Sequence, residues 1–213
     1  MSARVRVKIC GVTNEADARA AIALGADALG FNLFAGSPRF IELEREAAWI
    51  AALPPYVTRV AVLVNVPVAE ARRVATHPAI DLVQLHGDEG EGYCEELAAF
   101  GRSFVKALRV RDARSLDHAD RFSTPHLLLD AHAESGYGGT GLRFDPTLAA
   151  EAVQRFPRLQ IILAGGLRPD NIADAVRAVR PYAVDVASGV ESAPGRKDRD
   201  KMAALMTAVQ NTA

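Results

Sequence analysis

The sequence contains only two cysteines, Cys10 and Cys94, and no apolar run long enough to cross a lipid bilayer. Two cysteines are too few for a disulfide framework. The first residues run directly into an apolar segment, without the hydrophobic region of a signal peptide. We therefore expect a protein of the reducing cytoplasm, with no membrane partner.

The sequence also lacks an excess of either charge and any linker of Pro, Gly and Ser. It has 25 basic and 26 acidic residues and a formal net charge of -1. Nucleic acids and anionic membrane surfaces require a basic face, so neither is expected as a partner. The 213 residues suit one domain, and we expect a single catalytic domain over residues 1–213.

Short apolar runs alternate along the chain with Ala-rich amphipathic stretches. Most of the runs show little polar alternation, which is typical of parallel strands covered on both faces. The expected strands are Val5–Cys10, Ala26–Leu33, Arg59–Asn65, Leu82–His86, Phe104–Leu108, Leu127–Asp130, Gln160–Ala164 and Ala183–Ala187.

The stretches between these runs carry helix start and stop signals. Thr13 is the expected N-cap of the first helix, and Gly25 is expected to end it. Pro67 and Pro169 are expected in the first turns of two further helices, where a missing N–H costs nothing. The first helix is expected over Glu15–Leu24. The remaining expected helices are Glu42–Leu53, Glu91–Phe100, Asp112–Arg121, Pro146–Phe156 and Asp198–Gln210.

Eight strands alternating with about eight helices predict an α/β protein, a single (β/α)8 TIM barrel. A doubly wound open sheet is the alternative, but it usually has fewer strands and carries a glycine fingerprint that is missing after the first strand. In a barrel the active site lies where strands end and βα loops begin, so these junctions hold the candidate residues.

Two glycine turns follow the last two strands. Gly165 and Gly166 end strand seven, and Ser188 and Gly189 end strand eight. Glycines let backbone N–H groups approach a ligand closely, and the loops after strands seven and eight bind phosphate in many barrels. Tight βα turns without a ligand are the alternative, but the pair of turns favours a site for a small phosphorylated substrate.

A candidate base and a candidate acid close two other strands. Cys10 ends strand one, two residues from Lys8 on the same face, and a nearby ammonium favours a thiolate by lowering the thiol pKa. Alternatively, Cys10 is a small buried hydrophobe and Lys8 an interior ion-pair member. Asp130 closes the apolar strand six, where desolvation raises a carboxyl pKa and suits a general acid, unless it only caps or pairs.

Four further features complete the candidate site. Asp185 lies between valines in strand eight and either pairs with Lys8 or contacts substrate, and His86 at the end of strand four either binds ligand or is a hydrogen-bonded structural residue. Arg39 after strand two offers a guanidinium that suits a carboxylate. The segment 136–141 is too glycine-rich for a helix and is expected to be a loop over the mouth.

No cluster of side chains has metal-ligand spacing, and no dinucleotide or P-loop pattern occurs, so we expect neither a metal nor a cofactor. An acid, a base and a phosphate anchor without a cofactor indicate proton-shuttling isomerisation or elimination.

Over nearly its whole length the sequence resembles phosphoribosylanthranilate isomerases. The resemblance is carried, in order, by Lys8-Ile9-Cys10-Gly11, Ser37-Pro38-Arg39-Phe40, Val83-Gln84-Leu85-His86-Gly87, Leu128-Leu129-Asp130, Gly138-Gly139-Thr140-Gly141, Gly165-Gly166-Leu167, Val184-Asp185-Val186-Ala187-Ser188-Gly189-Val190-Glu191 and Pro194-Gly195-Arg196-Lys197-Asp198. Two positions depart from the usual pattern: Pro146 stands where a tryptophan is common, and Ala187 where a serine is common.

The resemblance implies an Amadori rearrangement in tryptophan biosynthesis. It assigns Cys10 as general base, Asp130 as general acid and Arg39 as the residue that holds the anthranilate carboxylate. It places Gly165, Gly166, Ser188 and Gly189 in the phosphate-binding turns.

The residues at the strand ends disfavour three other functions. The related histidine-pathway isomerase uses two aspartates, where strand one here offers Cys10, and a sugar-phosphate epimerase would need metal-binding histidines at strand ends. A non-catalytic phosphate-binding barrel would have lost Cys10 or Asp130. No apolar stripe suggests an interface, and we expect a monomer.

Overall fold

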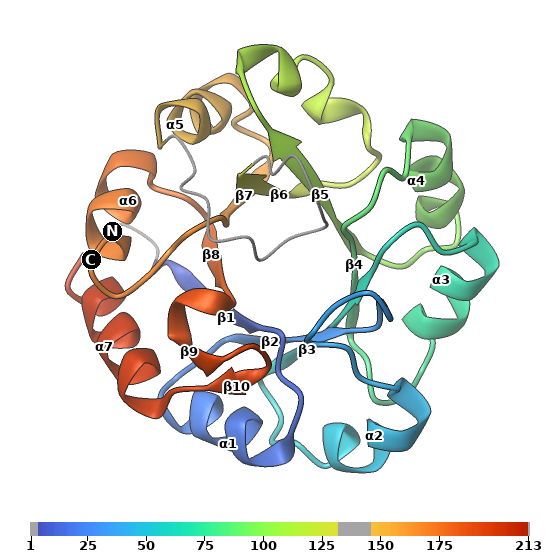
Figure 1. Cartoon of the computed structure of the whole chain (residues 1–213). Coiled ribbons are helices and arrows are strands. Elements are labelled where there is room, and N and C mark those ends of the chain that lie inside the picture. Colours follow the sequence, from blue (N-terminus) through green and yellow to red (C-terminus); the bar gives the residue numbers. More distant parts are fainter. Residues whose placement is uncertain (1–3, 132–145, 213) are drawn as a thin grey trace.

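The computed structural model of the chain describes residues 4–131 and 146–212. Eight parallel strands form a closed barrel in chain order, with β1 hydrogen-bonded to both β2 and β8, and helices surround it (Figure 1). The predicted (β/α)8 fold is confirmed. The barrel strands are β1 (Arg6–Cys10), β2 (Ala28–Asn32), β3 (Thr58–Leu63), β4 (Leu82–Leu85), β5 (Phe104–Val110), β6 (His126–Ala131), β7 (Gln160–Leu163) and β8 (Ala183–Val186).

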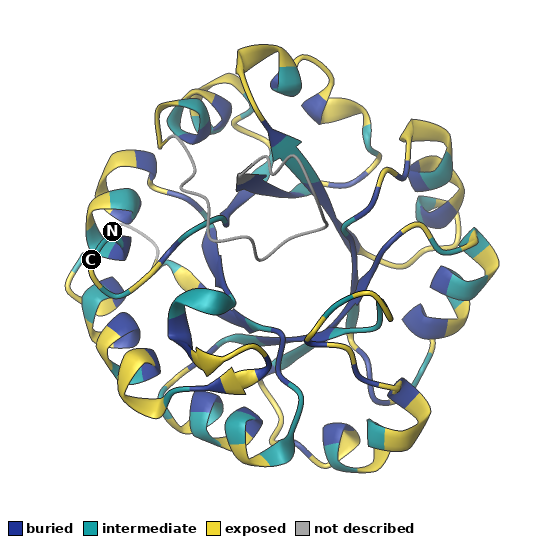
Figure 2. Ribbon diagram, viewed as in Figure 1, coloured by how far each residue is buried: buried dark blue, intermediate teal, exposed yellow. Residues whose placement is uncertain are grey.

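Seven α-helices lie on the outside of the barrel in the described part of the chain, and each exposes one side (Figure 2). They are α1 (Glu15–Ala23), α2 (Leu43–Ala51), α3 (Val68–Ala75), α4 (Glu91–Ala98), α5 (Pro146–Arg155), α6 (Ile172–Val179) and α7 (Arg199–Gln210).

The start of α1 differs in one detail from the prediction. Asn14, rather than Thr13, is the N-cap, because its side-chain oxygen accepts the backbone N–H of Asp17. The Thr13 hydroxyl instead donates to the carbonyl of Gly195, 2.6 Å away. Gly25 follows the helix with a φ of 96°, as expected of a glycine that ends a helix.

The two predicted proline positions lie just before their helices. Pro67 is the N-cap residue of α3, and Pro169 lies in the turn that leads into α6. Neither position requires a backbone N–H for the helical ladder, which is why proline is tolerated there.

The helix predicted over Asp112–Arg121 is wrong. Two short 3-10 turns, η1 (Ala113–Leu116) and η2 (Ala119–Arg121), stand in its place. Asp112 and Ser115 bond each other's backbone N–H groups in a capping box. Short polar side chains that bond the local backbone compete with a continuous helix, and Ser123 then turns the chain with a φ of 53°.

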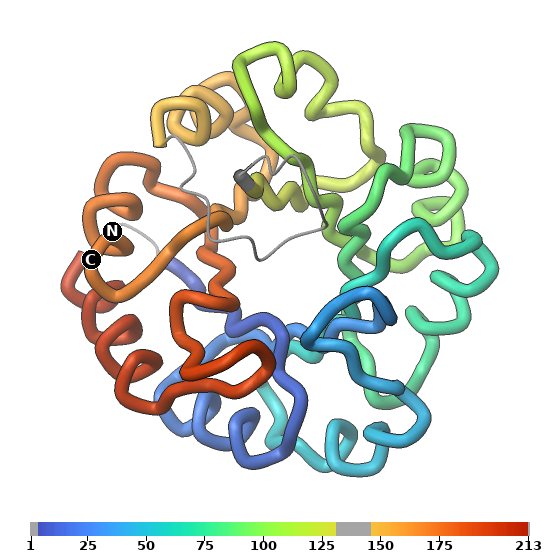
Figure 3. The backbone as a smooth tube through the Cα atoms, in the orientation of Figure 1, coloured from blue at the N-terminus to red at the C-terminus, as the bar shows by residue number. Residues whose placement is uncertain are grey.

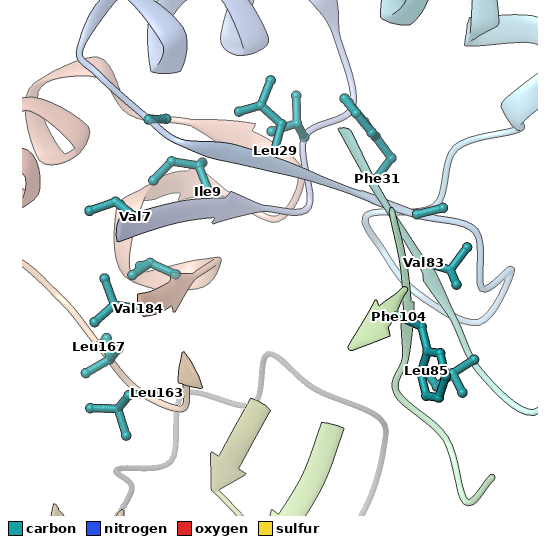
Figure 4. Close-up of a cluster of buried hydrophobic side chains, with 14 of the residues drawn as sticks. Val7, Ile9, Leu29, Phe31, Val83, Leu85, Phe104, Leu163, Leu167 and Val184 are labelled. Carbon is teal, nitrogen blue, oxygen red and sulfur yellow. The ribbon is translucent and has the colours of Figure 1, made fainter. Parts of the chain in front are cut away.

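Two apolar layers hold the barrel together. Inside it, Leu128 packs with residues of the neighbouring strands, whereas Leu127 and Leu129 of the same strand belong to the cluster between barrel and helices. This outer cluster also contains Val7, Ile9 and Phe31 (Figure 4). Because both faces of each strand are buried, the strands appear as unbroken apolar runs.

A small antiparallel hairpin follows β8. The turn η3 (Ser188–Val190) leads into β9 (Glu191–Ala193), which pairs with β10 (Arg196–Lys197) before α7 begins. The hairpin lies beside β1 and α1 at the end of the barrel that faces the viewer (Figure 3). The prediction did not contain it, although Pro194-Gly195 is a turn signal.

Candidate active site

A cavity of about 350 Å³ opens at the carboxyl ends of the barrel strands. Its volume is in the range of small-molecule sites. All nine predicted site residues line it: Cys10, Arg39, His86, Asp130, Gly165, Gly166, Asp185, Ser188 and Gly189. They come from six different strand ends or the loops that follow them, so the closed barrel is what brings them together.

Cys10 lies at the end of β1 in a space that glycine provides. A Cβ atom at Gly30 on β2 would lie 2.6 Å from Cys10 Sγ and 2.9 Å from Lys8 Nζ, closer than side chains tolerate. The thiol and the ammonium thus share the volume that a side chain at position 30 would fill, and the predicted proximity of Lys8 to Cys10 is confirmed.

The expectation that Lys8 gives Cys10 a lowered pKa is wrong. Burial and the negative charge of Asp185 raise the pKa of the thiol, and they outweigh the opposing effect of the Lys8 ammonium. Lys8 donates to both carboxylate oxygens of Asp185 at 2.9 Å, so its charge is already largely balanced. The predicted Lys8–Asp185 pairing is confirmed.

Asp130 at the end of β6 belongs to a chain of polar groups that starts inside the barrel. Its Oδ2 lies 3.3 Å from Nε2 of His86, and Nδ1 of His86 lies 2.9 Å from Nε2 of Gln84. A His86 ring that accepts from Gln84 at Nδ1 carries its proton on Nε2 and donates it to Asp130. Asp130 itself is buried, as expected of a group at the end of an apolar strand.

The loops after β7 and β8 touch each other at glycine positions. Gly165 and Gly166 have φ values of 87° and 64°, which favour glycine, and a Cβ atom at Gly189 would overlap the carbonyl oxygen of Leu167. The Asn171 side chain donates to the Gly166 carbonyl and stabilises the first turn. Ser188 lies at the start of η3 beside these glycines, so backbone donors and a hydroxyl border one corner of the cavity.

Arg39 is buried and paired, whereas an arginine on an open loop would be solvated. Its Nε and Nη2 donate to the two carboxylate oxygens of Glu191 at 2.9 and 2.7 Å. A Cβ atom at Gly11, whose φ is 73°, would overlap Arg39 Cδ, so the arginine stem packs directly on the turn after Cys10. The guanidinium therefore lies at the cavity wall next to β1.

The model of the family N-(5'phosphoribosyl)anthranilate (PRA) isomerase matches residues 7–208. The chain belongs to this family. The PRA isomerase of Geobacter metallireducens is 52% identical over 198 residues, which cover 93% of this chain and 95% of the relative.

Solved structures of PRA isomerases superpose on the barrel over almost all its length. The enzyme from Thermus thermophilus has a TM-score of 0.88 and 38% identity, covering 98% of this chain and 100% of that one. A PRA isomerase in complex with reduced 1-(o-carboxyphenylamino)-1-deoxyribulose 5-phosphate has a TM-score of 0.84 and 36% identity, covering 97% and 99%. The resemblance inferred from the sequence is confirmed, and the chain is an isomerase of this family.

Three residues of the candidate site in this PRA isomerase were not predicted from the sequence. Gly30 leaves room for Cys10, and Glu191 and Lys197 form ion pairs beside it. Gly30 interrupts an otherwise apolar strand, which is the usual signal of a close approach. Glu191 and Lys197 lie inside the family's sequence blocks, but no local pattern indicates which groups they contact.

Part of the expected site lies outside the described residues. The glycine-rich segment 136–141 falls within 132–145, so the loop remains a prediction. Pro146, which stands where a tryptophan is common, is described and begins α5. In residues 4–131 and 146–212, no three His, Cys, Asp or Glu side chains are arranged to hold a metal ion. Within the same ranges no helix is long and apolar enough to span a membrane.

Proposed function

We propose that this chain converts N-(5-phospho-β-D-ribosyl)anthranilate to 1-(2-carboxyphenylamino)-1-deoxy-D-ribulose 5-phosphate in tryptophan biosynthesis, with Asp130 as general acid and Cys10 as general base. The observation that carries the proposal is the convergence of these two groups, from β6 and β1, on one cavity whose rim holds two glycine turns and Arg39. The reaction rearranges bonds within the substrate and asks the enzyme only for proton transfers, which a carboxyl and a thiol supply without a cofactor.

The first step is opening of the sugar ring. Asp130 donates a proton to the furanose ring oxygen, the bond from C1 to that oxygen breaks, and the anthranilate nitrogen forms a double bond to C1. Asp130 is left as a carboxylate, and its hydrogen bond from His86 Nε2 stabilises the new charge.

The second step removes the proton from C2 of the sugar. The Cys10 thiolate takes this proton, and the electrons of the C–H bond neutralise the cationic Schiff base to give an enolamine, which tautomerises to the ketone. The iminium charge of the intermediate favours the thiolate at the moment when it is needed, which offsets the raised pKa of the free Cys10. Cys10 ends with one proton more and Asp130 with one fewer, and solvent restores both.

Recognition of the two ends of the substrate supplies orientation. The Gly165–Gly166 and Ser188–Gly189 turns bind the phosphate, and Arg39 binds the anthranilate carboxylate. His86 and Asp185 line the space between them and contact the sugar. The solved relative with reduced 1-(o-carboxyphenylamino)-1-deoxyribulose 5-phosphate supports a ligand with these two anionic ends. Holding both ends limits the motion of the reacting atoms, which contributes several kcal/mol to catalysis.

The test is a coupled fluorescence assay that generates phosphoribosylanthranilate in place and follows the loss of its fluorescence. The wild-type protein should turn over, and Cys10→Ser and Asp130→Asn should each lower kcat by about 10²–10⁴-fold. Cys94→Ser, in the outer layer behind the barrel, is the matched control and should retain activity.

Each failure in this assay has a distinct meaning. A folded wild type without turnover would contradict the proposed reaction and make the histidine-pathway isomerisation the next substrate to assay. Full activity in Cys10→Ser would support the proposed reaction but contradict the assignment of Cys10 as its general base. The cytoplasmic location and the monomeric state stay predictions, which fractionation and analytical ultracentrifugation would test.

A further inference from the structure

The β9–β10 hairpin buries two charged groups that the proposed reaction does not use. Glu191 and Lys197 are register partners across the hairpin, and their ion pair is 2.7 Å long. The side chain of Lys197 is 0% exposed and that of Glu191 is 4% exposed. Burial of two charges is costly, so such a pair is kept only where its remaining hydrogen bonds are made.

Lys197 meets this requirement with three oxygen atoms around its ammonium group. Nζ donates to Glu191 Oε1, to the carbonyl of Cys10 at 2.5 Å and to the carbonyl of Ala187 at 3.3 Å. An ammonium has three donors and no acceptor, so three acceptors match its charged form. Lys197 thereby connects Cys10 at the end of β1 with Ala187, which lies between β8 and Ser188.

Glu191 occupies one particular edge of the Arg39 guanidinium. It accepts from Nε and Nη2, and Nη1 has no hydrogen-bond partner among residues 4–131 and 146–212. A guanidinium offers two edges for bidentate binding, and here only the end formed by Nη1 and Nη2 is left for a ligand in the cavity. Two cations share one carboxylate, so the cluster of Arg39, Glu191 and Lys197 retains one net positive charge.

We propose that Glu191 and Lys197 are positioning residues of this site: Glu191 directs the Nη1–Nη2 end of Arg39 to the substrate carboxylate, and Lys197 supplies the net positive charge that this carboxylate and the Cys10 thiolate both require. The proposal rests on the proposed function for the identity of the carboxylate. The effect of Glu191 and Lys197 on Cys10 does not depend on that function and can be measured without substrate.

The charged groups around Cys10 make this effect specific. Lys8 and Asp185 face the thiol from β1 and β8 as an ion pair, while Lys197 and Arg39 face it from the hairpin and from the loop after β2. The Lys8–Asp185 pair is the same in every hairpin variant, so a difference between these variants and the wild type reports the charge of the hairpin cluster. Removal of the Lys197 cation should therefore raise the pKa of the Cys10 thiol, and removal of the Glu191 anion should lower it.

The experiment is the rate of Cys10 alkylation by iodoacetamide as a function of pH, without substrate, with Cys94 resolved by peptide mass spectrometry. Lys197→Met should raise the midpoint of the alkylation curve by about one pH unit, and Glu191→Gln should lower it. Lys201→Met is the matched control, because Lys201 also donates to the hairpin, at the Glu191 carbonyl, but is half-exposed. Its midpoint should equal that of the wild type.

The double variant Glu191→Gln/Lys197→Met removes both charges and leaves Arg39, so its midpoint should return to near the wild-type value. This variant contains no newly unpaired buried carboxylate, and it keeps the test valid if Lys197→Met does not fold. Shifts in the same direction for the two single variants, or a double variant that keeps a shift, would overturn the proposal and leave the cluster a purely structural role.

Binding of the reduced product analogue tests the part of the proposal that concerns the substrate carboxylate. Lys197→Met should weaken binding of reduced 1-(o-carboxyphenylamino)-1-deoxyribulose 5-phosphate about tenfold or more, and should leave unchanged the binding of the same compound without its carboxyl group. If Lys197→Met bound both compounds equally more weakly than the wild type, this part of the proposal would be overturned. Wild-type protein that fails to turn over phosphoribosylanthranilate would instead remove the proposed function, while the alkylation result would still decide the effect on Cys10.

Discussion

Gly30 and Cys10 are neighbours across β1 and β2, and the absence of a side chain on Gly30 is what gives the Cys10 sulfur its place. The same space admits the Lys8 ammonium. Gly30 does not have a left-handed φ, so its own backbone conformation does not require glycine. Glycine is required at this position because it leaves room for a side chain of the neighbouring strand.

Gly30→Ala should therefore displace the thiol while preserving the fold. We expect kcat to fall about ten- to hundredfold, because small misplacements of a reacting group are costly, and the free energy of unfolding to fall by about 1–3 kcal/mol. Steady-state assays and urea denaturation measure the two quantities. Gly90→Ala is the control, because its Cβ atom would meet nothing within 4 Å; equal activity of the two variants would contradict the prediction.

Gln84→Leu tests the polar chain that ends at Asp130. The Gln84 side chain is buried, its Nε2 faces His86, and its Oε1 has no hydrogen-bond partner in the described structure. A leucine of similar size loses one hydrogen bond and also removes the unpaired oxygen, so stability should change by no more than about 1 kcal/mol. Activity should nevertheless fall about tenfold, because His86 loses the group that orients its ring. A variant with wild-type kcat would show that His86 needs no such partner.

Gly189→Ala should separate the loops after β7 and β8, since the new methyl group would overlap the Leu167 carbonyl. Because these loops are the proposed phosphate site, we expect the KM of the phosphorylated substrate to rise about tenfold or more, with a smaller change in kcat. Binding of the reduced product analogue, measured by calorimetry, should weaken in parallel. Gly92→Ala, on the open surface of α4, should bind like the wild type.

The pH dependence of stability should reflect His126 at the start of β6. Burial lowers the pKa of this histidine, so the folded protein keeps the ring neutral at pH values where the unfolded chain already binds a proton. The free energy of unfolding should therefore decrease as the pH falls below about 6.5, until the folded-state pKa is reached.

Urea denaturation between pH 7 and pH 5 checks this prediction. His126→Gln should show a shallower loss of stability over this interval than the wild type, and His118→Gln, on an exposed side chain, serves as the control. Parallel curves for His126→Gln and the wild type would assign the acid sensitivity to other groups.

The strands were predictable because burial on both faces produces continuous apolar runs, such as Leu127–Leu129, that need no knowledge of the partner strand. The pairing of Lys8 with Asp185 could also be predicted, because a closed barrel makes the first and last strands neighbours. The Arg39–Glu191 pair was not, because it joins residues 152 positions apart through a hairpin that only the folded chain defines. The 3-10 turns over 113–121 depended on a local bond between Asp112 and Ser115 that competes with helical periodicity.

Closure of the barrel between β1 and β8 has a consequence for the chain as it is synthesised. Cys10 leaves the ribosome before the groups that surround it, Asp185 and Lys197, and Lys197 follows it by 187 residues. A nascent chain that ends before β8 has its thiol without either charged neighbour and without the second glycine turn. The proposed chemistry therefore requires β8 and the hairpin, and products truncated before them hold a cysteine without its charged neighbours.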